Sequence, residues 1–167
     1  MNYSNIEFEV SNGTGCGYSL YVQGCRNHCK NCFNRETWNF EGGIPFTRRV
    51  WFTLFNKMNK PYINRLTILG GEPFEPENQK ELVRFLRQFK NVFPEKTVWC
   101  YTGFTIEEIL CSECRCSTEY TQELLSMIDI LVDGRYVDEL RYVTLKFRGS
   151  SNQRILNLKE KNYGLGE

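Results

Sequence analysis

The sequence reads Gly24-Cys25-Arg26-Asn27-His28-Cys29-Lys30-Asn31-Cys32-Phe33 near its N-terminal end, with three cysteines at the spacing C-x-x-x-C-x-x-C. Cysteine thiolates hold iron–sulfur clusters, and a cluster of four irons takes four ligands. Three thiolates from one short loop leave one iron without a protein ligand. Such an open metal position is where a substrate can bind, as at catalytic zinc sites. We therefore interpret Cys25, Cys29 and Cys32 as the catalytic metal ligands of a 4Fe-4S cluster.

Two other uses of these cysteines are weighed against a cluster. A structural zinc site takes a second pair of ligands at similar spacing, and the only histidine of the chain, His28, lies inside the loop. A disulfide framework is typical of short secreted chains, but residues 1–5 lack the basic and then apolar pattern of a signal peptide. The spacing favours a cluster, with His28 as a bystander.

The composition indicates a single cytoplasmic domain. The chain has 167 residues, a net charge of +1 and eight cysteines. This length buries one hydrophobic core, and the near-neutral charge gives no electrostatic basis for binding nucleic acid or a membrane surface. No apolar run approaches the ~20 residues that span a bilayer. Cysteines without a secretory signal are expected to stay reduced in the cytoplasm.

Strand and helix patterns alternate along the chain. Strands are expected where short apolar runs are bounded by turn residues, and helices where apolar residues recur at spacings of three and four. Thr47 is the expected N-cap of the first helix, and Pro61 and Pro94 follow the two longer helices and end them. The expected strands are 6–10, 18–24, 65–69, 97–103 and 127–136, and the expected helices are 47–59, 77–92 and 105–109.

This alternation indicates βαβ units in an α/β fold with a mainly parallel sheet. Ligands bind beyond the carboxyl ends of parallel strands, where the segments 24–33, 70–73, 101–103 and 133–134 would gather. A complete eight-unit barrel takes ~250 residues, so we expect an incomplete, open β/α barrel. An open side would admit a protein as substrate.

Gly70-Gly71-Glu72-Pro73 follows the apolar run 65–69. Two glycines at the end of a strand allow the backbone to approach a ligand closely, and Glu72 adds a carboxylate. By itself this turn is weak evidence of a site, because glycine and proline are common in ordinary turns. Its meaning depends on the cysteine loop some forty residues earlier.

The cysteine loop, placed after the apolar strand 18–24, resembles the signature of the radical S-adenosylmethionine (SAM) enzymes. In that superfamily the three cysteines ligate the cluster, and SAM chelates the fourth iron through its amino and carboxylate groups. Gly70-Gly71-Glu72 lies where the superfamily has a Gly-Gly-Glu element that lines up the amino group of SAM. The usual loop has an aromatic residue before its last cysteine, whereas here Asn31 precedes Cys32 and the aromatic residue is Phe33.

The chain is also similar to a narrower family, the activating proteins of anaerobic (class III) ribonucleoside-triphosphate reductases. The resemblance runs from residue 2 to about residue 153 and accounts for Asn31 before Cys32. It is carried by motifs in a fixed order, namely Met1-Asn2-Tyr3, Phe33-Asn34, Thr37-Trp38, Gly43 to Thr47, the Gly-Gly-Glu-Pro turn, Trp99 to Gly103, Leu131 to Gly134, and Arg148-Gly149-Ser150-Ser151-Asn152-Gln153.

This resemblance implies a radical SAM domain over residues 1–155 and a C-terminal tail over 156–167. A flavodoxin-like or ferredoxin-like donor would supply an electron that splits SAM into methionine and a 5′-deoxyadenosyl radical. That radical would remove hydrogen from a backbone glycine of the large reductase subunit, so the chain would be the activator and make no deoxynucleotide itself. The implied SAM contacts are Asn31, Cys32 and Phe33 for the nucleoside and Gly70, Gly71 and Glu72 for the methionine end.

Two rival functions stay open at this point. Activation of a different glycyl-radical enzyme would use the same chemistry, although the Arg-Gly-Ser-Ser-Asn-Gln motif argues against it. A zinc-bound interaction module would be non-enzymatic, and it would be colourless where an iron–sulfur protein is brown.

For three later segments the sequence leaves alternatives open. The family pattern has no counterpart to Cys111-Ser112-Glu113-Cys114-Arg115-Cys116. This segment could bind zinc or a second cluster, with Cys100 as a further ligand, or it could be a loop of free thiols. The absence of an obvious fourth ligand in the sequence favours free thiols. Residues 148–153 offer donors and acceptors to a polar ligand or a partner backbone, or form a solvated loop. The tail from Leu156 is expected to be a terminal helix or a frayed end.

Overall fold

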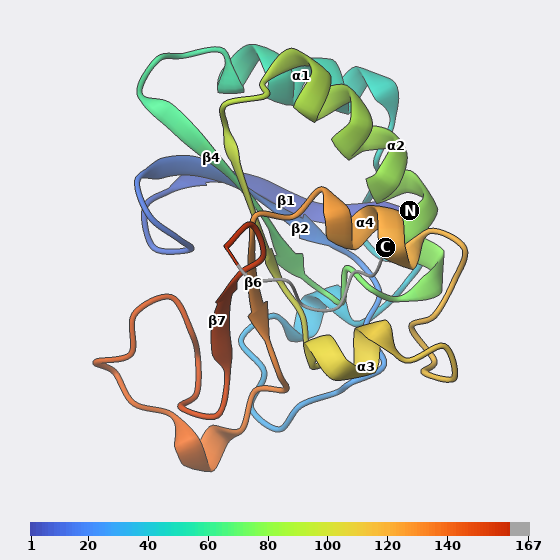
Figure 1. Cartoon of the computed structure of the whole chain (residues 1–167), viewed down its shortest axis with the longest axis vertical. Helices are drawn as coiled ribbons and strands as arrows, with labels where there is room; N and C mark the ends of the chain where they lie inside the picture. Colours follow the sequence, from blue (N-terminus) through green and yellow to red (C-terminus); the bar gives the residue numbers. More distant parts are fainter. Residues whose placement is uncertain (161–167) are drawn as a thin grey trace.

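A seven-stranded sheet runs through residues 1–160, the part of the chain that this computed structural model describes (Figure 1). The strand order is β3-β1-β2-β4-β5-β6-β7. Pairing is parallel among β2, β4, β5 and β6 and antiparallel at both edges. The predicted α/β fold with an open, mainly parallel sheet is confirmed, with the parallel pairing confined to the centre. The strands are β1 (Asn2–Glu9), β2 (Cys16–Val22), β3 (Ile44–Pro45), β4 (Ile63–Gly70), β5 (Thr97–Tyr101), β6 (Ile130–Asp133) and β7 (Arg154–Asn157).

The helices begin and end close to the predicted positions. Thr47 is the N-cap of the first helix, although its side chain makes no capping bond. Thr105 caps the third helix through a reciprocal pair of bonds with Glu108, a capping box. None of the helices in the described part of the chain is long and apolar enough to cross a membrane. The helices are α1 (Arg48–Met58), α2 (Pro76–Val92), α3 (Ile106–Leu110) and α4 (Thr121–Ser126), with short 3₁₀ turns η1 (Arg35–Thr37) and η2 (Asp138–Leu140).

The two faces of the sheet carry different side chains, because successive residues of a strand point to opposite sides. In β4, Leu66 and Ile68 belong to the hydrophobic core that the helices cover. Arg65 and Thr67, in contrast, contact the turn that joins β1 to β2. The same alternation holds in the neighbouring strands, so one sheet face packs on helices and the other remains available for a site.

Aromatic rings fill the space between the sheet and the helices α1 and α2, which lie together over one face (Figure 1). The fully buried ring of Phe85 contacts Phe46, Trp51 and Phe55 with centroid distances of 5.0, 5.7 and 5.8 Å. Aromatic pairs at this separation add to the free energy gained by burying their area. This cluster is therefore a main source of the stability of the helix layer.

Loops instead of helices cover the opposite face of the sheet. The buried guanidinium of Arg65 donates hydrogen bonds to the backbone oxygens of Glu9 and Asn12 and so fastens the turn between β1 and β2 against that face. The long connection between β6 and β7, residues 134–153, returns over the same side, where Phe147 packs against Trp99 at 5.5 Å. These two loops enclose a cavity above the sheet.

The chain after residue 153 differs from the expectation of a helix or frayed end. Residues 154–157 form β7, which pairs antiparallel with β6, so Leu156 lies in the sheet, and residues 158–160 form a turn. The strand forms because β6 would otherwise be an unpaired edge with exposed backbone groups. The remainder of the expected tail, 161–167, lies outside the described residues.

Truncation of the central ring should destabilise the whole chain. Phe85→Ala leaves a cavity among three other aromatic rings, so we expect the free energy of unfolding to fall by about 3–5 kcal/mol. Phe52 lies on α1 with 66% of its surface exposed, and Phe52→Ala should change the same quantity by less than about 0.5 kcal/mol. Urea unfolding of both variants measures the two effects, and equal effects would contradict the assigned core.

Candidate functional site

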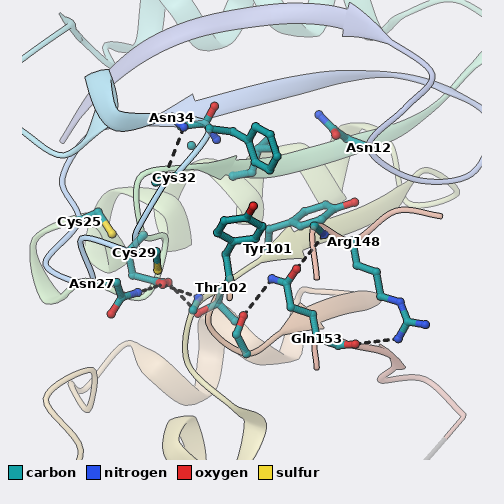
Figure 2. A pocket seen from close by; sticks show the side chains of 18 of the residues that line it. Asn12, Cys25, Asn27, Cys29, Cys32, Asn34, Tyr101, Thr102, Arg148 and Gln153 are labelled. Carbon is teal, nitrogen blue, oxygen red and sulfur yellow. Dashed lines mark hydrogen bonds between the residues drawn. The ribbon is translucent and has the colours of Figure 1, made fainter. Parts of the chain in front are cut away.

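The three predicted ligand cysteines, Cys25, Cys29 and Cys32, line one cavity of about 650 Å³ on the loop-covered face of the sheet. Figure 2 shows them on one side of Tyr101, with the side chains of Arg148 and Gln153 on the other. A volume of this size suits a small-molecule ligand. The segments expected at the carboxyl ends of the parallel strands do meet at this cavity.

The cysteine loop keeps its shape through left-handed backbone conformations. Gly24 has φ of 94°, and an added Cβ would lie 2.3 Å from the ring of Phe40, so only glycine fits there. His28 and Asn31 also have positive φ, 45° and 54°, which is rare for residues with side chains. These reversals curl the loop so that its sulfur atoms face the cavity.

Backbone amides point at the sulfur atoms. The amide of Asn34 donates to Sγ of Cys32 at 3.4 Å, and the backbone of Asn27 and of Tyr136 acts to lower the pKa of Cys25 and of Cys29, respectively. Such bonds favour the thiolate form that an iron–sulfur cluster requires. The chemistry of this donor set fits a cluster.

Burial acts on the same thiols in the opposite direction. It raises the pKa of Cys25 to about 12 and also raises that of Cys29. Metal binding must therefore displace their protons. Within residues 1–160 no group of three or more His, Cys, Asp or Glu side chains converges on a single-ion site, whereas a cluster spreads its ligands over several irons.

The Gly-Gly-Glu turn is hydrogen-bonded directly to the start of the cysteine loop. The amide of Glu72 donates to the carbonyl of Gly24 at 2.8 Å, and the amide of Gly71 donates to that of Val22 at 2.8 Å. A Cβ on Gly71 would lie 2.5 Å from the Gly24 oxygen. The two motifs that the sequence separates by some forty residues thus form one continuous rim of the cavity, with Gly70 beside them.

The carboxylate of Glu72 is buried and joins three segments. It accepts hydrogen bonds from the Phe74 amide at 3.0 Å, the Thr102 hydroxyl at 2.7 Å, the Gly103 amide at 2.7 Å and Nδ2 of Asn27 at 3.1 Å. A carboxylate has about four lone-pair positions, so these donors occupy all of them. Burial raises the pKa of Glu72 to about 7, because removal from water outweighs these bonds.

Two predicted SAM contacts differ in position. Phe33 lines the cavity and lies under the guanidinium of Arg141 at 4.8 Å. Asn31 does not line it, since its side chain points away and donates to Asp138 at 2.7 Å. The left-handed backbone at Asn31 turns this side chain to the outside of the loop.

The Arg-Gly-Ser-Ser-Asn-Gln segment uses its polar groups within the fold. The buried Gln153 accepts from the amides of Gly149 and Ser150 and donates to the Gly134 carbonyl at 2.9 Å. Arg148 donates to the Gln153 carbonyl at 2.8 Å. The segment therefore fastens the β6–β7 connection over the cavity. Arg148, Gly149 and Gln153 also line that cavity, so the expected use in binding a polar ligand stays a prediction.

Some cavity residues lie in segments that the sequence analysis expected there, and others do not. Tyr101 lies in the segment 101–103 expected at this edge. Tyr21, which faces the cavity because it alternates with the buried Leu20, and Asn12 of the β1–β2 turn belong to no such segment. Asn27 belongs to the cysteine loop, and its side chain lies at the cavity because it donates a hydrogen bond to Glu72. Strand alternation from the buried Leu20 was the signal that could have identified Tyr21.

The second cysteine group is not assembled around Cys100. Cys100 is buried in β5 on the helix-covered face, while Cys111 is exposed at the end of α3. Only Cys114 and Cys116 of this group have sulfur atoms within hydrogen-bonding distance of each other, at 3.2 Å, among the residues that the structure describes. The expected use as free thiols stays a prediction.

The raised pKa of Glu72 predicts a pH dependence of stability. Between pH ~5 and 7 the folded chain keeps a proton on Glu72 that the unfolded chain releases. The protonated group therefore adds to the free energy of unfolding in full below that range, and this addition is lost as the pH rises through 7. Between pH 5 and pH 8 the cluster-free chain should lose on the order of 2 kcal/mol of unfolding free energy relative to Glu72→Gln. Denaturant titrations of both proteins at the two pH values measure this difference.

The control is Glu77, whose pKa is lowered by Arg26. It stays ionised over the same range, so Glu77→Gln should show no comparable pH-dependent difference from the unmodified chain. A difference between the unmodified chain and Glu72→Gln that is constant with pH would contradict the assignment of Glu72 as the titrating group.

Comparisons with known proteins agree with this geometry. The family described as "4Fe-4S single cluster domain" matches residues 11–156, which contain the cysteine loop and the Gly-Gly-Glu turn. The chain is 37% identical over 156 residues to the anaerobic ribonucleoside-triphosphate reductase-activating protein of Enterobacteria phage T4, covering 93% of each chain.

Bacterial proteins of the same name are similar over nearly their whole length. The chain is 30% identical over 162 residues to that of Escherichia coli K12, covering 95% of this chain and 100% of the relative. It is 33% identical over 162 residues to that of Haemophilus influenzae, covering 95% and 99%. The chain therefore belongs to the family of anaerobic ribonucleoside-triphosphate reductase-activating proteins, which carry a single 4Fe-4S cluster domain.

Proposed function

We propose that this activating protein is a radical SAM enzyme that cleaves SAM reductively and generates a glycyl radical on the anaerobic ribonucleoside-triphosphate reductase. The observation that carries the proposal is the single cavity rim formed by Cys25, Cys29, Cys32 and the Gly-Gly-Glu turn. When bound, the cluster would pass one electron from an external donor to SAM, whose cleavage to methionine would supply a 5′-deoxyadenosyl radical able to take a hydrogen atom from a backbone glycine and so become 5′-deoxyadenosine. The residues of the chain supply binding, orientation and exclusion of water.

The residues of the rim have separate roles in this proposal. Cys25, Cys29 and Cys32 hold the cluster and leave one iron position for SAM. Gly70 and Gly71 present backbone without side chains to its methionine end, which allows close approach. Glu72 holds this backbone in place instead of binding SAM through its carboxylate, because that carboxylate already accepts four hydrogen bonds.

The nucleoside of SAM lies against Cys32 and Phe33 in this proposal. Both line the cavity, and the aromatic ring of Phe33 offers a stacking surface at its mouth. Asn31 remains a nucleoside contact only through its backbone, since its side chain is turned to Asp138. This backbone contact is compatible with the left-handed conformation that points the side chain outward.

The open side of the cavity suits a protein substrate. Apolar side chains at its mouth are exposed, with Val143 at 93%, Tyr142 at 60% and Phe33 at 59%. Exposed apolar groups at the edge of a cavity are typical of surfaces that bind another protein. We assign the part of this edge formed by Tyr142 and Val143 to the reductase segment that carries the glycine.

The electron donor has a separate route to the cluster. Cys25 also borders a second recess, lined by Arg26, His28, Trp38, Asn39 and Phe40. A flavodoxin-like or ferredoxin-like donor at this recess would reach the cysteine loop without entering the substrate cavity. The proposal places the protein in the cytoplasm, with residues 1–155 as its radical SAM domain.

The family match favours this function over a zinc-binding module, because the family is described by a 4Fe-4S cluster. Activation of another glycyl-radical enzyme would use the same cavity, and replacing the reductase by such an enzyme in the assays below distinguishes the two.

Removal of one cluster ligand should abolish cluster binding and SAM cleavage together. In Cys29→Ala two thiolates remain, too few to retain the cluster. Anaerobically reconstituted protein is reduced with dithionite, its iron is measured, and 5′-deoxyadenosine is quantified by chromatography. The unmodified chain should form 5′-deoxyadenosine, and Cys29→Ala should hold little iron and form none.

Cys16→Ala is the matched control, because Cys16 lies at the start of β2, outside the cavity. It should behave as the unmodified chain does. Retained SAM cleavage in Cys29→Ala would exclude this residue as a ligand, and a cluster-loaded chain that binds no SAM would overturn the proposed reaction.

A charge at the cavity mouth should weaken binding of the reductase and spare the chemistry. Val143→Glu places a carboxylate on the exposed apolar edge, and we expect its affinity for the large reductase subunit to fall at least about ten-fold. Val92→Glu is the control, since Val92 is an exposed valine at the end of α2 on the opposite sheet face. Binding is measured by anaerobic sedimentation or calorimetry, and dithionite-driven SAM cleavage without the reductase should be the same in all three proteins.

Equal affinity of Val143→Glu and Val92→Glu would show that the reductase binds elsewhere. Loss of SAM cleavage in Val143→Glu without the reductase would instead show that this edge belongs to the SAM site.

A further inference from the structure

The side chains of Cys114 and Cys116 contact each other beside the cluster loop, with their sulfur atoms 3.2 Å apart. We propose that they form a redox-active dithiol, which a low-molecular-weight disulfide oxidises reversibly to an intramolecular disulfide, and that Arg115 between them transmits this change to the cluster loop. The proposal depends on the cluster of the family but not on SAM cleavage. It gives a role to the cysteine segment that the function above leaves unused.

The two thiols differ in their access to an oxidant, and the backbone holds them close together. Cys116 is buried, whereas Cys114 is only partly buried, so an oxidant reaches Cys114 first. The backbone between Cys111 and Ser117 is a pair of tight turns, closed by bonds from the Cys114 amide to the Cys111 carbonyl at 3.2 Å and from the Ser117 amide to the Cys114 carbonyl at 2.9 Å. These turns hold the two sulfur atoms on the same side of the loop.

Arg115 connects this segment to the cluster loop. Its guanidinium donates to Oε1 of the buried Glu75 at 2.6 Å and to Oδ1 of Asn27 at 2.6 Å, and it lies over the ring of Phe104 at 4.5 Å. Asn27 stands between two cluster cysteines and binds Glu72 through its other amide atom. A shift of Arg115 therefore acts on the loop that holds the cluster.

The proposed reaction is a thiol–disulfide exchange in two steps. The thiolate of Cys114 attacks one sulfur of glutathione disulfide and releases one glutathione, which leaves a mixed disulfide. Cys116 then gives up its proton, attacks the Cys114 sulfur and releases the second glutathione. Two thiols are oxidised, one disulfide is reduced to two thiols, and no other reactant is needed.

Closing the bond must move Arg115. A disulfide brings the sulfur atoms to about 2.05 Å, more than 1 Å closer than their present 3.2 Å, and only one residue separates the two cysteines. The hydrogen bonds of Arg115 depend on the orientation of its planar guanidinium group. Displacement of the two flanking cysteines therefore weakens its hydrogen bonds to Glu75 and Asn27. The expected consequence is a looser cluster loop under oxidising conditions.

The first experiment detects the bond itself. Cluster-loaded protein is incubated without oxygen with glutathione disulfide, quenched with acid, alkylated and digested for mass spectrometry, with the cluster protecting the other loop's thiols. We expect a peptide in which a disulfide joins Cys114 and Cys116, and we expect dithiothreitol to reduce that disulfide. Cys111→Ala should form the same bond, whereas Cys114→Ala and Cys116→Ala should not.

The second experiment measures the link to the cluster. Loss of cluster absorbance to an iron chelator should be severalfold faster in the oxidised protein than in the reduced protein, and dithiothreitol should restore the slow rate. Arg115→Gln should show the fast rate without oxidation, and Cys111→Ala should keep the slow one. Mixed disulfides alone, or a bond with Cys111, would overturn the dithiol assignment, and an unchanged rate of cluster loss after oxidation would overturn the role of Arg115.

Discussion

The buried carboxylate of Glu72 is the contact on which the arrangement of the site depends. Its hydrogen bonds join the end of β4 to the turn after β5, through Thr102 and Gly103, and to the cysteine loop, through Asn27. Separate parts of the chain thereby keep their places around one cavity. An acidic group can occupy this buried position because every lone pair has a donor. Its raised pKa reflects the remaining desolvation penalty.

The sheet divides the molecule into a stabilising half and a functional half. On one face, helices α1 and α2 bury a continuous apolar core around Phe85. On the other, the β1–β2 turn and the β6–β7 connection cover the sheet with loops that are fastened by Arg65 and Gln153. Loops can be shaped around a ligand at little expense in stability when the core lies elsewhere. The family's cluster domain therefore combines a well-packed helix layer with an open site.

Regular elements were predictable where their own periodicity was strong, as in α2, in β4 and in the strands beside it. β7 was missed because its residues look like a polar tail, and it forms only where the edge of β6 needs a partner. α4 is short and without a strong apolar repeat, and packing against α2 stabilises it. At the site, cysteine spacing and paired glycines were recognisable in sequence, whereas the outward direction of the Asn31 side chain was not, because a left-handed backbone cannot be read from its neighbours.

The sequence by itself determined that this protein has the pattern of an iron–sulfur cluster site, because three cysteines at C-x-x-x-C-x-x-C spacing lie within one short loop, and the family match agrees with such a cluster. It also determined the α/β class through the alternation of strand and helix periods. Only the tertiary structure decided which polar groups are free for a ligand. Hydrogen bonds between residues far apart in the chain consume the carboxylate of Glu72 and the amide of Gln153, and turn Asn31 outward. Such competition for donors and acceptors exists only once the segments are brought together.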